Sequence, residues 1–368
     1  MNFQPLPFPS TLEQYQKQAG ELLEAYRLGD PRAIRVVHEN HPLPDSEIRS
    51  AALDISGAQL TIARWHSFQG WPALVEYVEA VTRDGSAVFQ FESAVEAVIA
   101  GDAATLQSSL GGNPDLARAR STRITHFDPP VHRATLLHYV AANGVEGHRQ
   151  KTPANAVAIA RMLLEAGAEV DALAAMYGGH CTTMSMLVSS SHPAKAGVQV
   201  ALVETMLDFG ADIEGRGSGK WGSPLMTALA FGYRGAAEAL AGRGADVGDV
   251  AAAAGLGRLD DAERLLAAAG PESRHRALAL AAQHGHAAIV GLLLDRGEDP
   301  NRYNPDGNHA HSTPLHQAVA AGHDAVVRLL VERGARLDIK DTVYQGTPLG
   351  WAMYAGQTGI GNYLRGSA

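Results

Sequence analysis

Six of the sixteen histidines lie between residues 126 and 192, among other side chains that can bind ligands. His126, Asp128 and His132 could supply two nitrogen ligands and one oxygen ligand to a transition metal, with positions left open for catalysis. No H-E-x-x-H or comparable motif places these three side chains on one face of an element. The spacing is therefore also compatible with a patch that contacts a polar ligand, or with hairpin residues that only hydrogen-bond to the backbone. We expect no other cofactor.

A second group of reactive residue types lies at Tyr177, His180 and Cys181. Cys181 next to His180 suggests a nucleophile, but a thiol needs a base that is positioned in space rather than in sequence. The alternative is a buried, inert cysteine at the start of a helix. Polar and basic side chains of this region favour a polar or anionic ligand. The remaining candidates for ligand contact are Arg133, Tyr139, His148, Arg149 and Trp221.

These residues are embedded in a repeated pattern that is clearest at Thr313-Pro314-Leu315-His316. Thr313 suits a helix N-cap and Pro314 the first helical position, while the imidazole of His316 can complete a capping box. Gly322 and Gly334 would then end an inner and an outer helix. Such a period predicts helix pairs that stack in chain order, each burying its apolar face against its neighbours.

The pattern predicts an all-α solenoid of about eight units over residues 86–368, with short β-hairpin loops between helix pairs. Residues 1–85 are predicted to be helical but less regular, with a proline-rich, extended lead-in at their start. We interpret this segment as a divergent N-terminal helical cap that packs on the array. A separate domain with a boundary near residues 82–86 is the alternative.

The chain resembles ankyrin-repeat proteins through its T-P-L-H and G-H…L-L…G-A elements, over about three quarters of its length. It is also similar to a bacterial group of ankyrin proteins, through Ala58-Gln59-Leu60-Thr61-Ile62-Ala63 and Gly70-Trp71-Pro72. The resemblance implies hairpin tips and inner helices that line a concave, protein-binding face.

Two consecutive units depart from the pattern because they are too long. The step from His316 to Gly334 is 18 residues, whereas the equivalent step from His138 to Gly167 is 29 and that from Ser185 to Gly210 is 25. The extra residues fall at 145–155 and 189–199, between inner and outer helices. Neighbouring insertions should emerge on the same side of the stack, beside the hairpins at 126–133 and 177–181. Long insertions of this kind often serve a function, so they could form the wall of a pocket.

Composition excludes several classes of function. A net charge of −9 and the absence of a basic block argue against nucleic acid as the partner. The single cysteine rules out an internal disulfide and fits a reducing compartment. The first 20 residues lack the basic start and apolar core of a signal peptide, and no run of about 18 apolar residues predicts a membrane span. We therefore expect a cytoplasmic protein with neither nucleic-acid nor membrane partners.

The sequence favours a binding module over an enzyme, with the concave face recognising a protein or peptide partner. The alternative is a small-molecule receptor or enzyme whose histidine-rich pocket lies between the two hairpins and the two insertions. Trp221 and Tyr344 are predicted near hairpins, where an exposed aromatic ring would anchor a partner.

Overall fold

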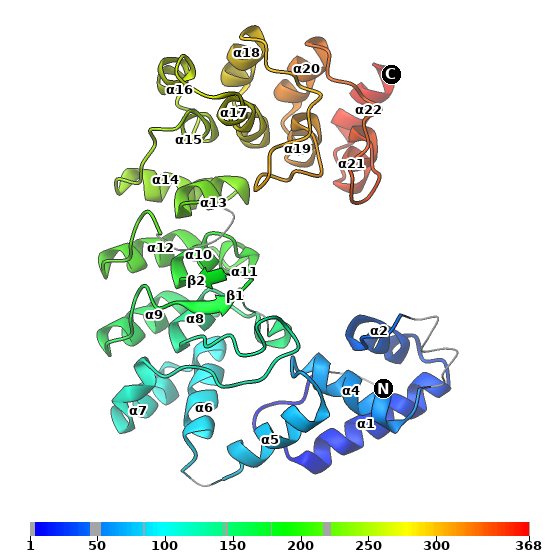
Figure 1. The fold of residues 1–368 in the computed structure, drawn as a ribbon, viewed down its shortest axis with the longest axis vertical. Coiled ribbons are helices and arrows are strands. Elements are labelled where there is room, and N and C mark those ends of the chain that lie inside the picture. The colour runs from blue at the N-terminus through cyan, green and yellow to red at the C-terminus, as the bar shows by residue number, and fades with distance from the viewer. Residues whose placement is uncertain are drawn as a thin grey trace. The chain divides into compact units, whose positions relative to one another are not determined.

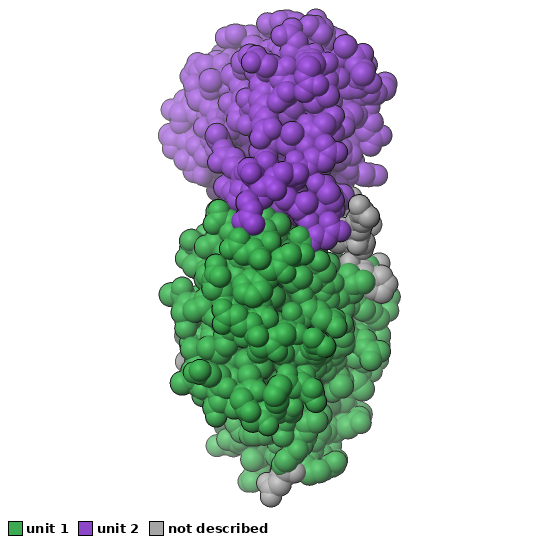
Figure 2. Space-filling view, turned by 90° about the vertical axis from the view of Figure 1, so that its left-hand side faces the viewer, with its two compact units in different colours: residues 1–211, 217–219 green, residues 212–216, 220–368 purple. Residues whose placement is uncertain are grey.

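The computed structural model describes residues 4–44, 53–83, 85–142, 144, 146–177, 179–215 and 222–367. Trp221 lies outside these residues. The chain divides into two compact units (Figure 2). Unit 1 holds the described residues up to Ala211, and unit 2 holds those from Asp212 onward. The four helices of the predicted cap therefore share unit 1 with the first helix pairs of the array.

The described residues of the N-terminal part of unit 1 form four helices (Figure 1): α1 (Leu12–Arg27), α2 (Pro31–Asn40), α4 (Ile55–Trp65) and α5 (Trp71–Val81). Helix α1 begins with a capping box, in which the side chain of Thr11 accepts a hydrogen bond from the amide of Gln14 and the side chain of Gln14 accepts one from the amide of Thr11. Apolar side chains of these helices form one core, in which Leu22, Ile62 and Leu74 are completely buried. As the sequence predicts, residues 4–10 contain no helix and lead into α1.

The rest of unit 1 consists of three helix pairs, which contain both insertions. Their elements are α6 (Ala87–Ala100), α7 (Ala103–Gly112), η1 (Pro114–Ala117), α8 (Leu136–Val140), η2 (Gly147–Arg149), α9 (Ala156–Glu165), β1 (Ala174–Met176), β2 (Gly179–Cys181), α10 (Thr183–Leu187), α11 (Ser191–Lys195) and α12 (Gln199–Asp208). The two strands pair in antiparallel fashion as a short hairpin. The first insertion contains the 3-10 turn η2, and the second contains α11.

Unit 2 consists of five helix pairs in two rows (Figure 1). The inner row is α13 (Pro224–Ala230), α15 (Val250–Gly255), α17 (Pro271–His284), α19 (Pro314–Ala320) and α21 (Pro348–Tyr354). The outer row is α14 (Arg234–Gly242), α16 (Leu259–Leu266), α18 (Ala287–Asp295), α20 (Asp324–Glu332) and α22 (Thr358–Gly366). Each helix packs on its partner. Successive helices also pack together along the inner row, and from α16 to α22 along the outer row, so the predicted all-α solenoid is confirmed.

Local sequence explains how the helix pairs begin and end. Thr313 and His316 form the predicted capping box at α19, and Thr135 and His138 form the same box at α8. Gly285 ends α17 with a φ of +82°, and a Cβ atom there would lie 2.6 Å from the imidazole of His323. Glycine therefore allows the left-handed turn and the close packing of the next repeat.

No described helix combines the length and the apolar composition that crossing a membrane requires.

Candidate functional site

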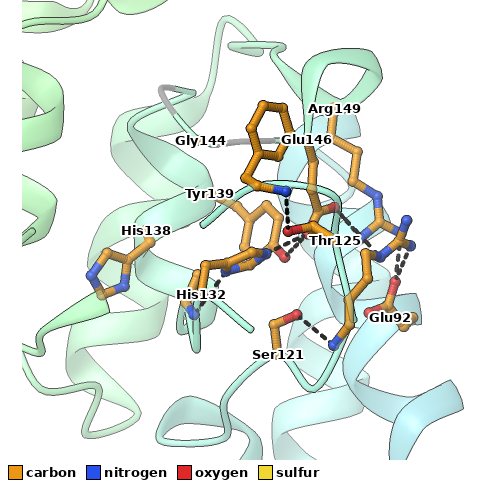
Figure 3. A network of polar contacts seen from close by, with 12 residues as sticks. Glu92, Ser121, Thr125, His132, His138, Tyr139, Gly144, Glu146 and Arg149 are labelled. Atoms are coloured by element: carbon orange, nitrogen blue, oxygen red, sulfur yellow. Dashed lines mark hydrogen bonds and ion pairs between the residues drawn. The ribbon is translucent and has the colours of Figure 1, made fainter. Parts of the chain in front are cut away.

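Four charged side chains meet in the interior of unit 1 (Figure 3). Glu92 comes from α6, Arg123 from the loop before α8, and Glu146 and Arg149 from the first insertion. Each side chain is at most 3% exposed. Glu92 Oε2 accepts hydrogen bonds from Arg123 Nη2 at 2.8 Å and from Arg149 Nη2 at 2.6 Å. Arg149 Nη1 donates to Glu146 Oε2 at 3.0 Å. We call these four residues the buried charge network.

The carboxylates of the network are stabilised in their ionised form. Burial by itself would raise the pKa of Glu146, but the guanidinium groups of Arg123 and Arg149 and a hydrogen bond from His132 hold this pKa well below its usual range. Burial would likewise raise the pKa of Glu92, and the same two guanidinium groups lower it. Two carboxylates that stay ionised are poor proton donors.

Two neutral side chains complete the coordination of Glu146 (Figure 3). Tyr139 donates its hydroxyl hydrogen to Glu146 Oε1 at 2.8 Å. The imidazole of His132 lies 2.9 Å from the same oxygen through Nε2, while its Nδ1 accepts a hydrogen bond from the amide of Ala134. This pattern assigns the proton to Nε2, so His132 is a donor. Both oxygens of a buried carboxylate are thereby satisfied.

Arg123 connects the network to the N-terminal helices. Its guanidinium lies 4.5 Å from the ring centroids of both Phe68 and Tyr77, a cation–π arrangement. Its Nη1 donates to the carbonyl of His66 at 3.2 Å, and the Tyr77 hydroxyl donates to Glu92 at 3.0 Å. The network therefore connects the cap to the first two repeats, and we interpret its role as structural.

The structure brings together three of the predicted site residues, His132, Tyr139 and Arg149, around Glu146. His148 lies next to them, with its ring centroid 5.5 Å from that of His66. The two predicted hairpins are neighbours, because the amide of Ala175 donates to the carbonyl of His132 at 2.7 Å. This confirms that adjacent hairpins place the two clusters side by side.

The other predicted residues have separate surroundings. His126 packs on Phe127, with ring centroids 4.1 Å apart, while Asp128, Arg133 and Tyr177 are exposed. His180 belongs to β2, where its backbone pairs with that of Ala175. The described residues, which include His126, Asp128 and His132, contain no group of three or more His, Cys, Asp or Glu side chains arranged to hold a metal ion.

Cys181 is half-buried, and its thiol donates to the carbonyl of Met176 at 3.3 Å. Burial raises the pKa of this thiol. A nucleophilic cysteine needs the opposite shift, because the thiolate is the reactive form.

The pocket expected between the hairpins and the insertions is filled by side chains. The space that His132, His138, Tyr139, Glu146 and their described neighbours line measures about 20 Å³, which is room for a single water molecule. The expectation of a ligand-sized pocket at this place was wrong, because the first insertion turns inward and inserts Glu146 and Arg149 against α6. A cavity of about 530 Å³ lies instead between the N-terminal residues, the cap and the first repeats.

Sequence reasoning missed Glu92, Arg123 and Glu146. Glu92 offered a signal, because it is a charged residue on the otherwise apolar face of α6, beside Phe91 and Val95. A charge at such a position must be paired, and the two arginines are its partners. Glu146 lies within the insertion that the repeat length singled out.

Histidine burial predicts a specific pH dependence of stability. His138 is fully buried, and burial lowers its pKa to about 4, while its Nδ1 accepts a hydrogen bond from the amide of Thr135. Above pH 6.5 this histidine is neutral in both the folded and the unfolded chain. Below pH 6.5 only the unfolded chain binds the proton, so the free energy of unfolding decreases by about 1.4 kcal/mol per pH unit until about pH 4. The decrease from pH 7 to pH 5 should be about 2 kcal/mol smaller in His138→Gln than in the wild type, as measured by urea denaturation.

An unchanged pH dependence in His138→Gln would show that His138 does not couple folding to protonation.

A second candidate site is the surface of the last two repeats in unit 2. Val343 and Tyr344 form the tip of the loop before α21, and Met353 and Tyr354 end that helix. Tyr344 is 78% exposed and Tyr354 is 97% exposed. Large apolar side chains with this exposure are typical of interaction surfaces. We call these four residues the apolar tip.

A loop carboxylate holds the apolar tip in place. Asp341 is buried, and its carboxylate accepts hydrogen bonds from the amides of Val343, Tyr344 and Gly346 at 2.9, 2.6 and 2.8 Å. It also accepts one from Trp351 Nε1 at 3.0 Å, which links the loop to α21. The position of Tyr344 is therefore set by the fold before any partner binds.

The comparison with protein families agrees with this architecture. The family model described as ankyrin repeats (3 copies) matches residues 249–341 and 278–367, which contain the last helix pairs of unit 2. No curated protein matches the chain. Ankyrin repeats generally mediate protein–protein interactions. Residues 249–367 therefore form ankyrin repeats.

Proposed function

We propose that this protein is a protein-binding module that recognises a protein or peptide partner through its inner helices and hairpin tips. The observation that carries the proposal is the apolar tip, Val343, Tyr344, Met353 and Tyr354, which leaves two tyrosines and two aliphatic side chains in water. Burial of such side chains by a partner supplies binding free energy, and tyrosine is among the residues enriched at binding hot spots.

The surroundings of the tip support this function. Tyr344 lies beside His311, whose ring also packs near Trp351, with centroid distances of 6.5 and 5.9 Å. The tip is therefore an aromatic surface on a rigid support, which limits the conformational entropy that binding would cost. The net charge of −9 favours a protein or peptide over nucleic acid as the partner.

The alternative function, a small-molecule receptor or enzyme between the hairpins at 126–133 and 177–181, has less support. The space at that place holds about one water molecule. The candidate nucleophile Cys181 has a raised pKa, which reduces the fraction of thiolate.

Substitution of the two tyrosines tests the proposal. Site-specific incorporation of a photoreactive phenylalanine at position 344 should crosslink a discrete partner in cells, which mass spectrometry identifies. Tyr344→Ala and Tyr354→Ala should each then weaken the affinity for that partner by about 2 kcal/mol, or about thirtyfold in Kd, by calorimetry. Leu28→Ala is the matched control, because Leu28 is an exposed apolar residue of unit 1. A partner that binds the double variant as tightly as the wild type would refute the assignment of this surface.

A further inference from the structure

A cavity with a volume of about 530 Å³ lies in unit 1. This volume is within the size range of small-ligand pockets. Its walls come from residues 4–10, from the cap, and from the first insertion with α6. Gln4, Pro7 and Lys151 are exposed members of the lining, so the cavity reaches solvent between the N-terminal residues and the insertion.

Residues 4–10, which we call the N-terminal strap, are held across this space by contacts with several elements. The amide of Leu6 donates to His66 Nε2 at 3.3 Å, and Gln18 Nε2 donates to the carbonyl of Gln4 at 2.8 Å. Phe8 packs on Phe89 of α6, with ring centroids 5.7 Å apart. The strap therefore forms an ordered wall of the cavity.

Most of the charged groups in the lining are already paired. Arg123 and Arg149 bind the carboxylates of the buried charge network, and Glu96 is bound by Arg149 at 3.0 Å. Lys151 differs from them, because its ammonium group has neither an ion pair nor a hydrogen bond with any described residue. No carboxylate of the described residues pairs with this lysine.

The two histidines of the lining do not add positive charge. Burial, with the positive charges of Arg123 and Arg149, lowers the pKa of His66 to about 3. The same causes hold the pKa of His148 well below its usual range. Because His66 Nε2 accepts the hydrogen bond of Leu6, its proton lies on Nδ1. The hydroxyl of Tyr15 is a further donor of the lining, and it forms no hydrogen bond with another described residue. Among the described residues, the lining thus offers the ammonium group of Lys151 and neutral donors.

Most of the remaining lining is apolar or aromatic: Pro5, Leu6, Phe8, Phe68, Tyr77 and Ile99. The polar residue Ser10 donates its hydroxyl hydrogen to the carbonyl of Pro7 at 2.6 Å. A ligand that complements this cavity needs an apolar body for these side chains and one negatively charged group for Lys151.

We propose that this cavity binds a small organic anion, an aromatic or similarly apolar body that carries a single carboxylate or phosphate group. Lys151 pairs with the acidic group at the mouth, the Tyr15 hydroxyl donates a hydrogen bond within the cavity, and the body lies against the strap and Phe68. The site also explains why the first insertion is longer than the repeat requires, because it carries both Lys151 and His148.

Isothermal titration calorimetry of the full chain tests the proposal with four probes: phenylacetate, phenyl phosphate, phenylacetamide and inorganic phosphate. At least one of the two aryl anions, phenylacetate or phenyl phosphate, should bind. The anion that binds with the lower Kd shows whether the natural ligand carries a carboxylate or a phosphate group. Phenylacetamide, which keeps the shape of phenylacetate but lacks the charge, should bind about tenfold more weakly. Inorganic phosphate should give no measurable binding, because it lacks the apolar body.

Matched lysine variants locate the site. Lys151→Gln should weaken binding of the preferred aryl anion about tenfold, because the unpaired cation is lost. Lys195→Gln should leave binding unchanged, since Lys195 is an exposed lysine on α11 in the same unit and does not line the cavity. Leu6→Trp should abolish binding by filling the cavity from the strap, and circular dichroism should show the wild-type fold for all three variants.

The proposal is overturned if neither aryl anion binds the wild-type chain at millimolar concentration. It is also overturned if Lys151→Gln and Lys195→Gln bind equally well, or if the amide binds as tightly as the acid. Each of these results leaves the proposed protein-binding function of unit 2 untouched, because the apolar tip belongs to the other unit.

Discussion

Arg149→Met is expected to lower the free energy of unfolding of unit 1 by about 3–5 kcal/mol, because it leaves buried carboxylates without their partner. Arg149 binds Glu92, Glu146 and Glu96, at 2.6, 3.0 and 3.0 Å, and its side chain is 2% exposed. Arg123 alone cannot neutralise both buried glutamates. Hydrogen exchange followed by mass spectrometry should show the loss of protection in peptides from α6, α8 and α9, while peptides from unit 2 keep theirs.

A matched exposed pair controls for the loss of an arginine. Arg234 binds Glu238 at 2.7 Å, but both side chains are more than half exposed. Arg234→Met should therefore cost less than about 0.5 kcal/mol. The double variant Glu146→Gln with Arg149→Met should lose less stability than the two single variants lose together. The reason is that Glu146→Gln removes a buried carboxylate that Arg149→Met leaves without its partner. Equal losses for Arg149→Met and Arg234→Met would show that the buried charge network does not hold unit 1 together.

Asp341→Ala is expected to destabilise the last two repeats by about 3 kcal/mol, because it leaves buried amide donors and the Trp351 indole without an acceptor. Burial would raise the pKa of Asp341, but the hydrogen bonds from Tyr344, Trp351, Gly346 and Val343 lower it to about 2. The ionised carboxylate therefore stabilises the fold fully above about pH 4, and this contribution is lost as the pH falls toward 2. Amide hydrogen exchange at Val343, Tyr344 and Gly346, with urea denaturation at pH 7, measures the effect.

Asp338 provides the control for Asp341, because it lies three residues earlier in the chain. Its carboxylate is 71% exposed and pairs only with the exposed Arg336. Asp338→Ala should leave both the urea midpoint and the amide protection of the loop unchanged. If Asp341→Ala kept protected amides at Val343 and Tyr344, the loop would be held by other contacts and Asp341 would not position the apolar tip.

Local sequence was sufficient to predict the elements of the repeats. A capping box involves residues three positions apart, so Thr135 with His138 and Thr313 with His316 could be recognised from spacing alone. Gly285 could also be recognised from the sequence, because the residue that ends a helix often adopts the left-handed conformation that glycine favours. The stacking order of the repeats predicted that the two hairpins are neighbours. The hydrogen bond from the amide of Ala175 to the carbonyl of His132 confirms this prediction.

The candidate site could be predicted only in part, because its contacts join distant segments. His132, Tyr139 and Arg149 were identified by residue type and by the insertion beside them. Their common partner Glu146 was not identified, and Glu92 lies 57 residues from Arg149. An ion pair over such a separation leaves no periodic signal in the sequence. Only the buried position of Glu92 on an apolar helix face pointed to it.

The amino-acid sequence by itself determined that this chain is a stack of helix pairs, because capping residues, helix-ending glycines and apolar spacing act within a few residues of one another. The tertiary structure decided where ligand-sized space remains. The inward turn of the first insertion fills the region between the hairpins, and the cavity that the strap covers remains open beside Lys151. Such volumes depend on how side chains from distant segments pack together, and close packing is a property of the folded chain.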